Sequence, residues 1–178
     1  MAKLRMRAAL SALAAGILIT VGGCSEQSPT LNVEPEAGQH YQRIEVTRSP
    51  GGASFDSGSG RAEKVIGPEG GTLAIPGGHT LTFPAGALSQ PTAIRARVDA
   101  QYVAVELEPH GIRFPVGRGP ALALSYQGSN AEAFGKLVTL YIGDSNQVEE
   151  VLSVENNRAA QTATVRLQHF SRYYLAGN

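Results

Sequence analysis

The thiol of Cys24, the only cysteine in the chain, directly follows Val21-Gly22-Gly23. Small residues before a cysteine are the pattern of a bacterial lipobox, where a peptidase cuts before the cysteine and the thiol carries a diacylglyceryl group. A lone cysteine also excludes an internal disulfide and a thiolate metal cluster. We therefore predict that Cys24 is lipidated, and the alternative is an incidental thiol just past an ordinary cleavage site.

The residues before Cys24 have the order of a secretory signal peptide, which we assign to residues 1–23. Residues 8–20 form an uncharged run of small and apolar side chains. The run is shorter than the roughly 20 residues that a membrane-spanning helix needs. The cationic start before it consists of Lys3, Arg5 and Arg7.

A lipid on Cys24 implies a membrane as the first partner of the mature protein. Each buried methylene contributes about 0.8 kcal/mol, so two or three fatty acyl chains such as palmitate hold a protein on a bilayer. We expect a bacterial cell-envelope protein, and Ser25 favours the outer membrane where two membranes are present.

The charge balance argues against a nucleic-acid partner. The whole chain has 15 basic and 15 acidic side chains. Because three of the basic ones lie in the leader, the mature part is net acidic, unlike a surface that binds phosphates.

Other groupings of chemically active side chains are weaker. Glu106 and Glu108 share one face of an expected strand and are candidates for paired carboxylates, although a solvated face is the simpler interpretation. The oxygen ligands of a weak calcium loop are present but lack the twelve-position pattern, so a hairpin turn is favoured there. These ligands are Asp144, Ser145, Asn146, Glu149 and Glu150.

The histidines show no metal-ligand spacing, and the glycines around Gly67 and Gly77 lack the lysine and helix of a phosphate loop. The four histidines are His40, His79, His110 and His169. We expect no metal and no cofactor.

Residues 24–62 read as a flexible tether with several prolines and few apolar side chains to bury. Residues 41–46 alternate, with Tyr41, Ile44 and Val46 as the larger apolar members. An edge strand or a partner-binding segment is therefore the alternative for this part.

Residues 63–178 predict an all-β fold, a single antiparallel β-sandwich with a small barrel as the alternative. In residues 92–98, Ile94 and Ala96 fall on one face and Arg95 and Arg97 on the other, as expected for a sheet with one wet face. The expected strands are 72–75, 80–83, 92–98, 102–108, 121–126, 137–142, 148–154, 163–167 and 173–176. Residues 76–78, 143–146 and 155–158 are expected turns.

Four short motifs, in this order, resemble the ZU-five domain of ankyrins, netrin receptors and the death-domain protein PIDD, which recurs in bacterial secreted proteins. They are Gly67-Pro68-Glu69-Gly70-Gly71-Thr72-Leu73, Leu81-Thr82-Phe83-Pro84-Ala85-Gly86-Ala87-Leu88, Pro109-His110-Gly111-Ile112-Arg113-Phe114 and His169-Phe170-Ser171-Arg172-Tyr173. The resemblance covers about residues 65–176. It implies a β-sandwich that serves in protein-protein contact or as a structural module, without enzymatic turnover.

The resemblance also singles out His169-Phe170-Ser171, because PIDD is cut between the Phe and Ser of such a triplet. The serine hydroxyl attacks the preceding carbonyl, and water releases the resulting ester. Here His169 is the candidate base and Ser171 the candidate nucleophile, which requires hydrogen-bond reach between them. The alternative, which we favour, is that Phe170 anchors the core while His169 and Ser171 satisfy backbone groups of the turn.

Overall fold

The computed structural model describes residues 40–47, 60–143 and 145–178. The strands of this part are β1 (Gln42–Arg43), β2 (Arg61–Ile66), β3 (Gly71–Ile75), β4 (His79–Phe83), β5 (Thr92–Val98), β6 (Ala104–Glu108), β7 (Ala121–Ser125), β8 (Leu137–Ile142), β9 (Val148–Ser153), β10 (Glu155–Asn157), β11 (Thr162–Arg166) and β12 (Arg172–Gly177). Two 3₁₀ turns, η1 (Pro76–Gly78) and η2 (Ala131–Ala133), are the helical elements described.

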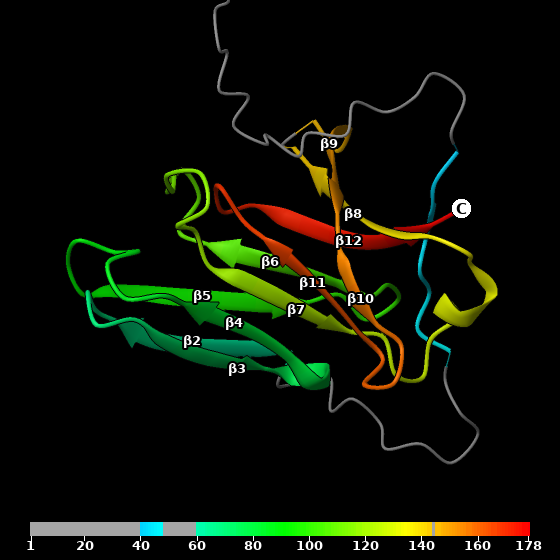
Figure 1. Ribbon diagram of the computed structural model, residues 1–178, viewed down its shortest axis with the longest axis horizontal. Coiled ribbons are helices and arrows are strands. Elements are labelled where there is room, and N and C mark those ends of the chain that lie inside the picture. Colours follow the sequence, from blue (N-terminus) through cyan, green and yellow to red (C-terminus); the bar gives the residue numbers. More distant parts are fainter. Residues whose placement is uncertain (1–39, 48–59, 144) are drawn as a thin grey trace, which may run out of the picture.

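The strands form two antiparallel sheets that pack together (Figure 1). One sheet has the order β2-β5-β6-β12-β8-β9, with β1 beside β12, and the other has the order β10-β11-β7-β4-β3. The predicted all-β sandwich is confirmed.

Alternating side chains explain why these segments are strands. In β5, Ile94 and Ala96 are buried, whereas Arg95 and Arg97 are exposed. The observed bounds of β5 are those predicted, because each strand buries one face between the sheets and leaves the other toward solvent.

The predicted hairpin is formed by β3 and β4, which pair from Gly71 and Phe83 to Ile75 and His79. Its turn is the short 3₁₀ segment η1, in which Gly77 has a φ of 80°. A left-handed backbone conformation of this kind favours glycine.

The core between the sheets contains a triangle of phenylalanines from three separate segments. Phe114 and Phe170 lie 5.3 Å apart between ring centroids, and Phe83 lies 6.3 Å and 6.0 Å from them, all edge to face. Such contacts add to the stabilisation from burial. The triangle joins β4 to the segment that leads into β12.

The predicted turn at residues 155–158 is wrong, because Glu155–Asn157 is strand β10, paired with β11. Only Val154 separates β9 from β10, and the chain passes there from one sheet to the other (Figure 1). The turn comes after β10, where the Asn157 side chain accepts a 3.0 Å hydrogen bond from the Ala160 N–H.

The predicted tether is wrong for residues 40–47. Gln42–Arg43 forms strand β1 against Ala176–Gly177, and Ile44 is fully buried. The alternative of a strand is the one observed, but residues 44–47 do not lie at a sheet edge, because they are hydrogen-bonded on both sides. Ile44 is buried in the core and Val46 packs against it. Residues 61–62, which were also assigned to the tether, belong to strand β2. Residues 24–39 and 48–59 lie outside the described residues.

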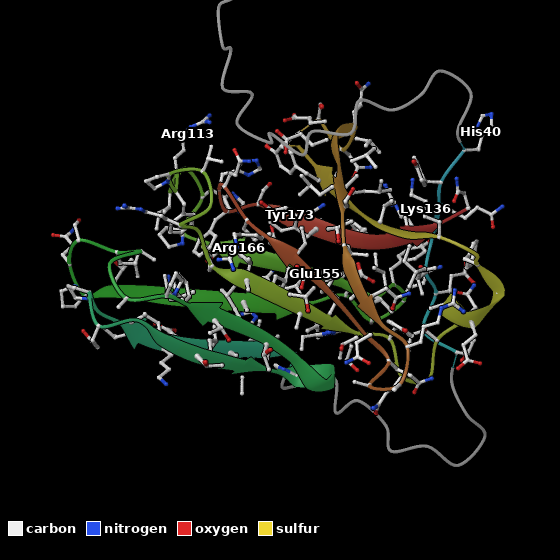
Figure 2. All side chains as sticks on the ribbon, in the orientation of Figure 1. His40, Arg113, Lys136, Glu155, Arg166 and Tyr173 are labelled. Carbon is white, nitrogen blue, oxygen red and sulfur yellow. The ribbon has the colours of Figure 1, made fainter. Side chains whose placement is uncertain are left out.

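The chain begins its described course at the opposite end of the sandwich from the loop between β6 and β7. Figure 2 shows His40 and Arg113 far apart at these two ends. Within the described residues, no helix has the length and apolar character needed to cross a bilayer.

Candidate functional site

His169-Phe170-Ser171 forms the last connection before β12. Its backbone pairs with the loop after β6: the Phe114 N–H donates to the Gln168 carbonyl at 2.7 Å, and the Phe170 N–H donates to the Ile112 carbonyl at 3.3 Å. Arg113 and His169 form an isolated antiparallel bridge. Two sequence motifs of the ZU-five resemblance are thus brought side by side.

Phe170 is 3% exposed and supplies one ring of the phenylalanine triangle. This burial fixes the triplet between β11 and β12, in agreement with the structural role favoured for it.

The ring of His169 lies among aromatic and acidic side chains of β8, β9 and β12. Its Nδ1 is 3.0 Å from the Tyr173 hydroxyl, and its Nε2 is 3.6 Å from a carboxylate oxygen of Glu150. The Tyr141 ring lies 4.4 Å away between centroids. Both nitrogens of His169 therefore have partners on other elements.

Tyr173 holds this arrangement as a neutral phenol. Burial, the charge of Glu150 and the neighbouring Tyr141 raise the pKa of Tyr173. Its hydroxyl donates a 2.6 Å hydrogen bond to the backbone carbonyl of His169.

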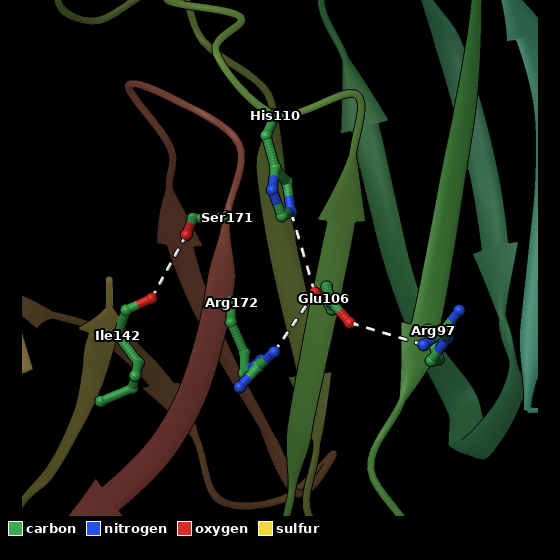
Figure 3. A network of polar contacts seen from close by, with 6 residues as sticks. All are labelled: Arg97, Glu106, His110, Ile142, Ser171 and Arg172. Carbon is green, nitrogen blue, oxygen red and sulfur yellow. Dashed lines mark hydrogen bonds and ion pairs between the residues drawn. The ribbon is translucent and has the colours of Figure 1, made fainter. Parts of the chain in front are cut away.

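The hydroxyl of Ser171 is directed to another strand. It donates to the Ile142 carbonyl at 3.3 Å, while the Ser171 carbonyl accepts from the Leu107 N–H at 2.9 Å. Figure 3 shows this hydroxyl facing Ile142.

The triplet therefore places base and nucleophile in one short segment without joining their side chains. In the part of the chain that the structure describes, His169 and Ser171 make no hydrogen bond to each other. An acyl shift needs the hydroxyl turned toward the Phe170 carbonyl with the imidazole within reach. Self-cleavage stays a prediction that requires both side chains to reorient.

Of the candidate carboxylate pair, Glu106 forms part of an ion-pair network on the outer face of the larger sheet, and Glu108 lines a hollow beside it. One Glu106 oxygen lies 3.4 Å from Arg172 and 3.8 Å from His110, and the other lies 4.0 Å from Arg97 (Figure 3). Glu106 thus faces cations, and its side chain is only 20% exposed.

This network borders a shallow hollow of about 300 Å³ over β2, β5 and β6. A separate ion pair on this surface joins Arg95 and Glu63 at 3.1 Å. We call this surface the charged face; its lining residues are Arg61, Ala62, Glu63, Arg95, Ala96, Arg97, Glu106 and Glu108.

Alternation along the strands places Glu106, Arg95 and Arg97 outward but does not by itself bring them together. The alternating charges of the two segments could have indicated these contacts, because antiparallel pairing of β5 with β6 sets Arg97 opposite Glu106 and Arg95 opposite Glu108.

The segment considered as a weak calcium loop contains the tight turn that was favoured for it, between the paired strands β8 and β9. The Gly143 N–H donates to the Gln147 carbonyl at 3.1 Å, and the Asn146 N–H donates back to the Gly143 carbonyl at 2.9 Å. Asp144 lies outside the described residues. No group of three metal-ligating side chains occurs within residues 40–47, 60–143 and 145–178.

Cys24 and the predicted signal peptide also lie outside the described residues. Neither a scan against models of known protein families nor a search of curated proteins gives a match to this chain. The ZU-five resemblance therefore depends on the four motifs and on the sandwich.

Proposed function

We propose that this chain is a bacterial lipoprotein, anchored to an envelope membrane through lipid on Cys24, whose ZU-five-like sandwich binds another protein without catalysing a reaction. The cationic start, the apolar run of residues 8–20 and the sole cysteine after them support the anchor. The order of the four motifs supports the ZU-five-like sandwich. The partner is an envelope or extracellular protein.

The charged face is the observation that carries the binding role. The side chains of Arg95 and Arg97 are 59% and 53% exposed and lie 3.1 Å and 4.0 Å from carboxylate oxygens of Glu63 and Glu106. Arginine is enriched at protein interfaces, and complementary charges steer association and set register. Exposed side chains of both signs suit a polar protein surface.

The surroundings of His169 and Ser171 support the absence of catalysis. Each polar side-chain atom of the pair is engaged by a group with a structural role: Tyr173 and Glu150 for the imidazole, and the Ile142 carbonyl for the hydroxyl. The alternative function, self-cleavage between Phe170 and Ser171, would release a C-terminal octapeptide that begins at Ser171.

The anchor is tested by metabolic labelling with a fatty acid in a bacterial host. We expect label on the full-length protein and none on the Cys24→Ser variant. A full-length protein without label would remove the anchor from this proposal.

The binding role is tested by crosslinking from intact envelopes, comparing two double charge reversals. Arg95→Glu with Arg97→Glu alters the charged face, whereas Arg113→Glu with Arg118→Glu alters a loop at the end of the sandwich. We expect the first pair alone to remove a specific crosslinked product. Equal crosslinking in all variants would assign binding to another surface.

A further inference from the structure

Residues 40–47 pack within the sandwich but are separated in the sequence from the other strands. The next strand in the sequence, β2, begins at Arg61. Residues 48–59 between them read Arg-Ser-Pro-Gly-Gly-Ala-Ser-Phe-Asp-Ser-Gly-Ser, a composition typical of a linker.

The segment of residues 40–47 is bonded through its backbone on both sides. On one side, the Ile44 N–H donates to the Leu175 carbonyl at 2.9 Å, and the Ile44 carbonyl accepts from the Val103 N–H at 2.9 Å. The Val46 N–H continues this side by donating to the Gln101 carbonyl at 2.8 Å.

On the other side, the partners are residues 128–130. The Glu45 carbonyl accepts from the Asn130 N–H at 3.1 Å, and the Glu45 N–H donates to Asn130 Oδ1 at 2.9 Å. The Thr47 N–H donates to the Gly128 carbonyl at 2.8 Å. We name the groove made by residues 101–103, 128–130 and 175–177 the strand groove.

Alternate side chains of the segment enter two different apolar regions. Ile44 is fully buried in the core between the sheets. Tyr41 packs on the opposite side, against a second apolar cluster on the outer face of the larger sheet. Arg43 places its guanidinium 4.4 Å from the ring centroid of Tyr174 on that side.

One wall of the strand groove is held by hydrogen bonds that do not involve residues 40–47. In this wall the Leu175 N–H donates to the Val103 carbonyl at 2.8 Å, and β6 pairs with β12 at Arg172–Tyr174. Residues 128–130, the opposite wall, are hydrogen-bonded to residues 45–47.

We propose that the strand groove is a binding site for an extended peptide and that residues 40–47 are its resident ligand, which a segment of a partner protein can replace. Backbone hydrogen bonds supply affinity and pockets for alternate side chains supply selectivity, as in strand addition. The required pattern is an aromatic residue, a guanidinium and an aliphatic residue at the positions of Tyr41, Arg43 and Ile44.

Because residues 40–47 belong to the same chain as the strand groove, they have a high effective concentration there. A partner segment must therefore compete with them. This inference extends the proposed function, because it adds a second protein-binding surface apart from the charged face. Release of the segment would also lengthen the connection to the lipid on Cys24.

The experiment uses the full-length protein in detergent with a protease cleavage sequence placed within residues 48–59. After the cut, a fluorescent synthetic peptide of residues 40–47 is added in excess. We expect the N-terminal fragment to remain bound until it is displaced by this peptide, and the uncut protein to take up at least tenfold less label. An Ile44→Asp peptide is expected to fail, whereas a Gln42→Asp peptide, altered at an exposed side chain, is expected to bind.

Two outcomes would overturn the proposal. If the sandwich loses its cooperative thermal unfolding when the fragment is displaced, residues 40–47 are an integral strand. If the fragment departs and the labelled peptide does not enter, the groove is no binding site. Neither outcome touches fatty-acid labelling or crosslinking through the charged face, so a failure here is distinguishable from failure of the proposed function.

Discussion

The phenol of Tyr173 meets His169 at two atoms, donating to its backbone carbonyl at 2.6 Å and lying 3.0 Å from its Nδ1. This contact spans four residues and fixes both the backbone entering β12 and the direction of the imidazole. With Nδ1 at Tyr173, the Nε2 atom is left to face Glu150.

Replacing Tyr173 with Phe should destabilise the sandwich by about 1–2 kcal/mol, because the buried His169 carbonyl loses its donor while the ring is retained. Urea unfolding followed by circular dichroism measures the change. Tyr126→Phe is the matched control: it loses a 2.8 Å hydrogen bond to Asn156, whose side chain lies on the exposed strand β10. Equal losses in both variants would show that the Tyr173 contact has no special role in the turn.

Much of the strand pattern could be predicted from sequence because each strand buries one face. The predicted bounds of β5 and β8 are those observed, since their apolar side chains alternate or form a continuous run between turn residues. The local sequence of Glu155–Asn157 predicts a turn, because Asn favours turns locally. Its strand conformation depends on β11, whose pairing is not visible in the segment itself.

The sequence identified the residues of the candidate site but not the contacts between them. The outward direction of Glu106 followed from alternation, but its ion pairs depend on the register of β5, β6 and β12. Strand β1 was only the alternative for residues 41–46 for a similar reason. Its partners, Ala176 and Gly177, lie far away in the sequence. Within residues 40–47, Ile44 is the side chain that is fully buried.

The purified protein should carry an intact C-terminus at Asn178, because the Ser171 hydroxyl is hydrogen-bonded to the Ile142 carbonyl and not directed at His169. Mass spectrometry under denaturing conditions is the measurement. An octapeptide beginning at Ser171 that disappears in Ser171→Ala would contradict this prediction and establish self-cleavage.

Thr139→Val should stabilise the protein by about 1 kcal/mol, since a buried hydroxyl without a partner is costly. Thr139 is fully buried in β8, between Leu175 and Leu152 on the neighbouring strands, and its Oγ1 has no hydrogen-bond partner in the part of the chain described. The comparison is Thr82→Val, at an exposed hydroxyl that pairs with Thr72. A loss of stability at Thr139, measured by urea unfolding, would mean that the hydroxyl has a partner in solution.

His79 should make the stability depend on pH in the acid range. It is 7% exposed in β4, and its Nδ1 accepts a 3.0 Å hydrogen bond from the Ser125 N–H. Burial lowers the pKa of His79 to about 4 from the usual 6.5. The folded state therefore holds the neutral imidazole over a range in which the unfolded chain takes up a proton.

Because the unfolded state binds more protons between these two pKa values, the free energy of unfolding rises with pH there. The contribution of His79 is fully present above pH 6.5 and is lost as the pH falls toward 4, by on the order of 3 kcal/mol. Urea unfolding at a series of pH values measures this slope. His79→Asn keeps an acceptor for Ser125 but does not titrate, so its slope should be smaller between pH 6.5 and 4; the same slope in both proteins would assign the acid sensitivity to other groups.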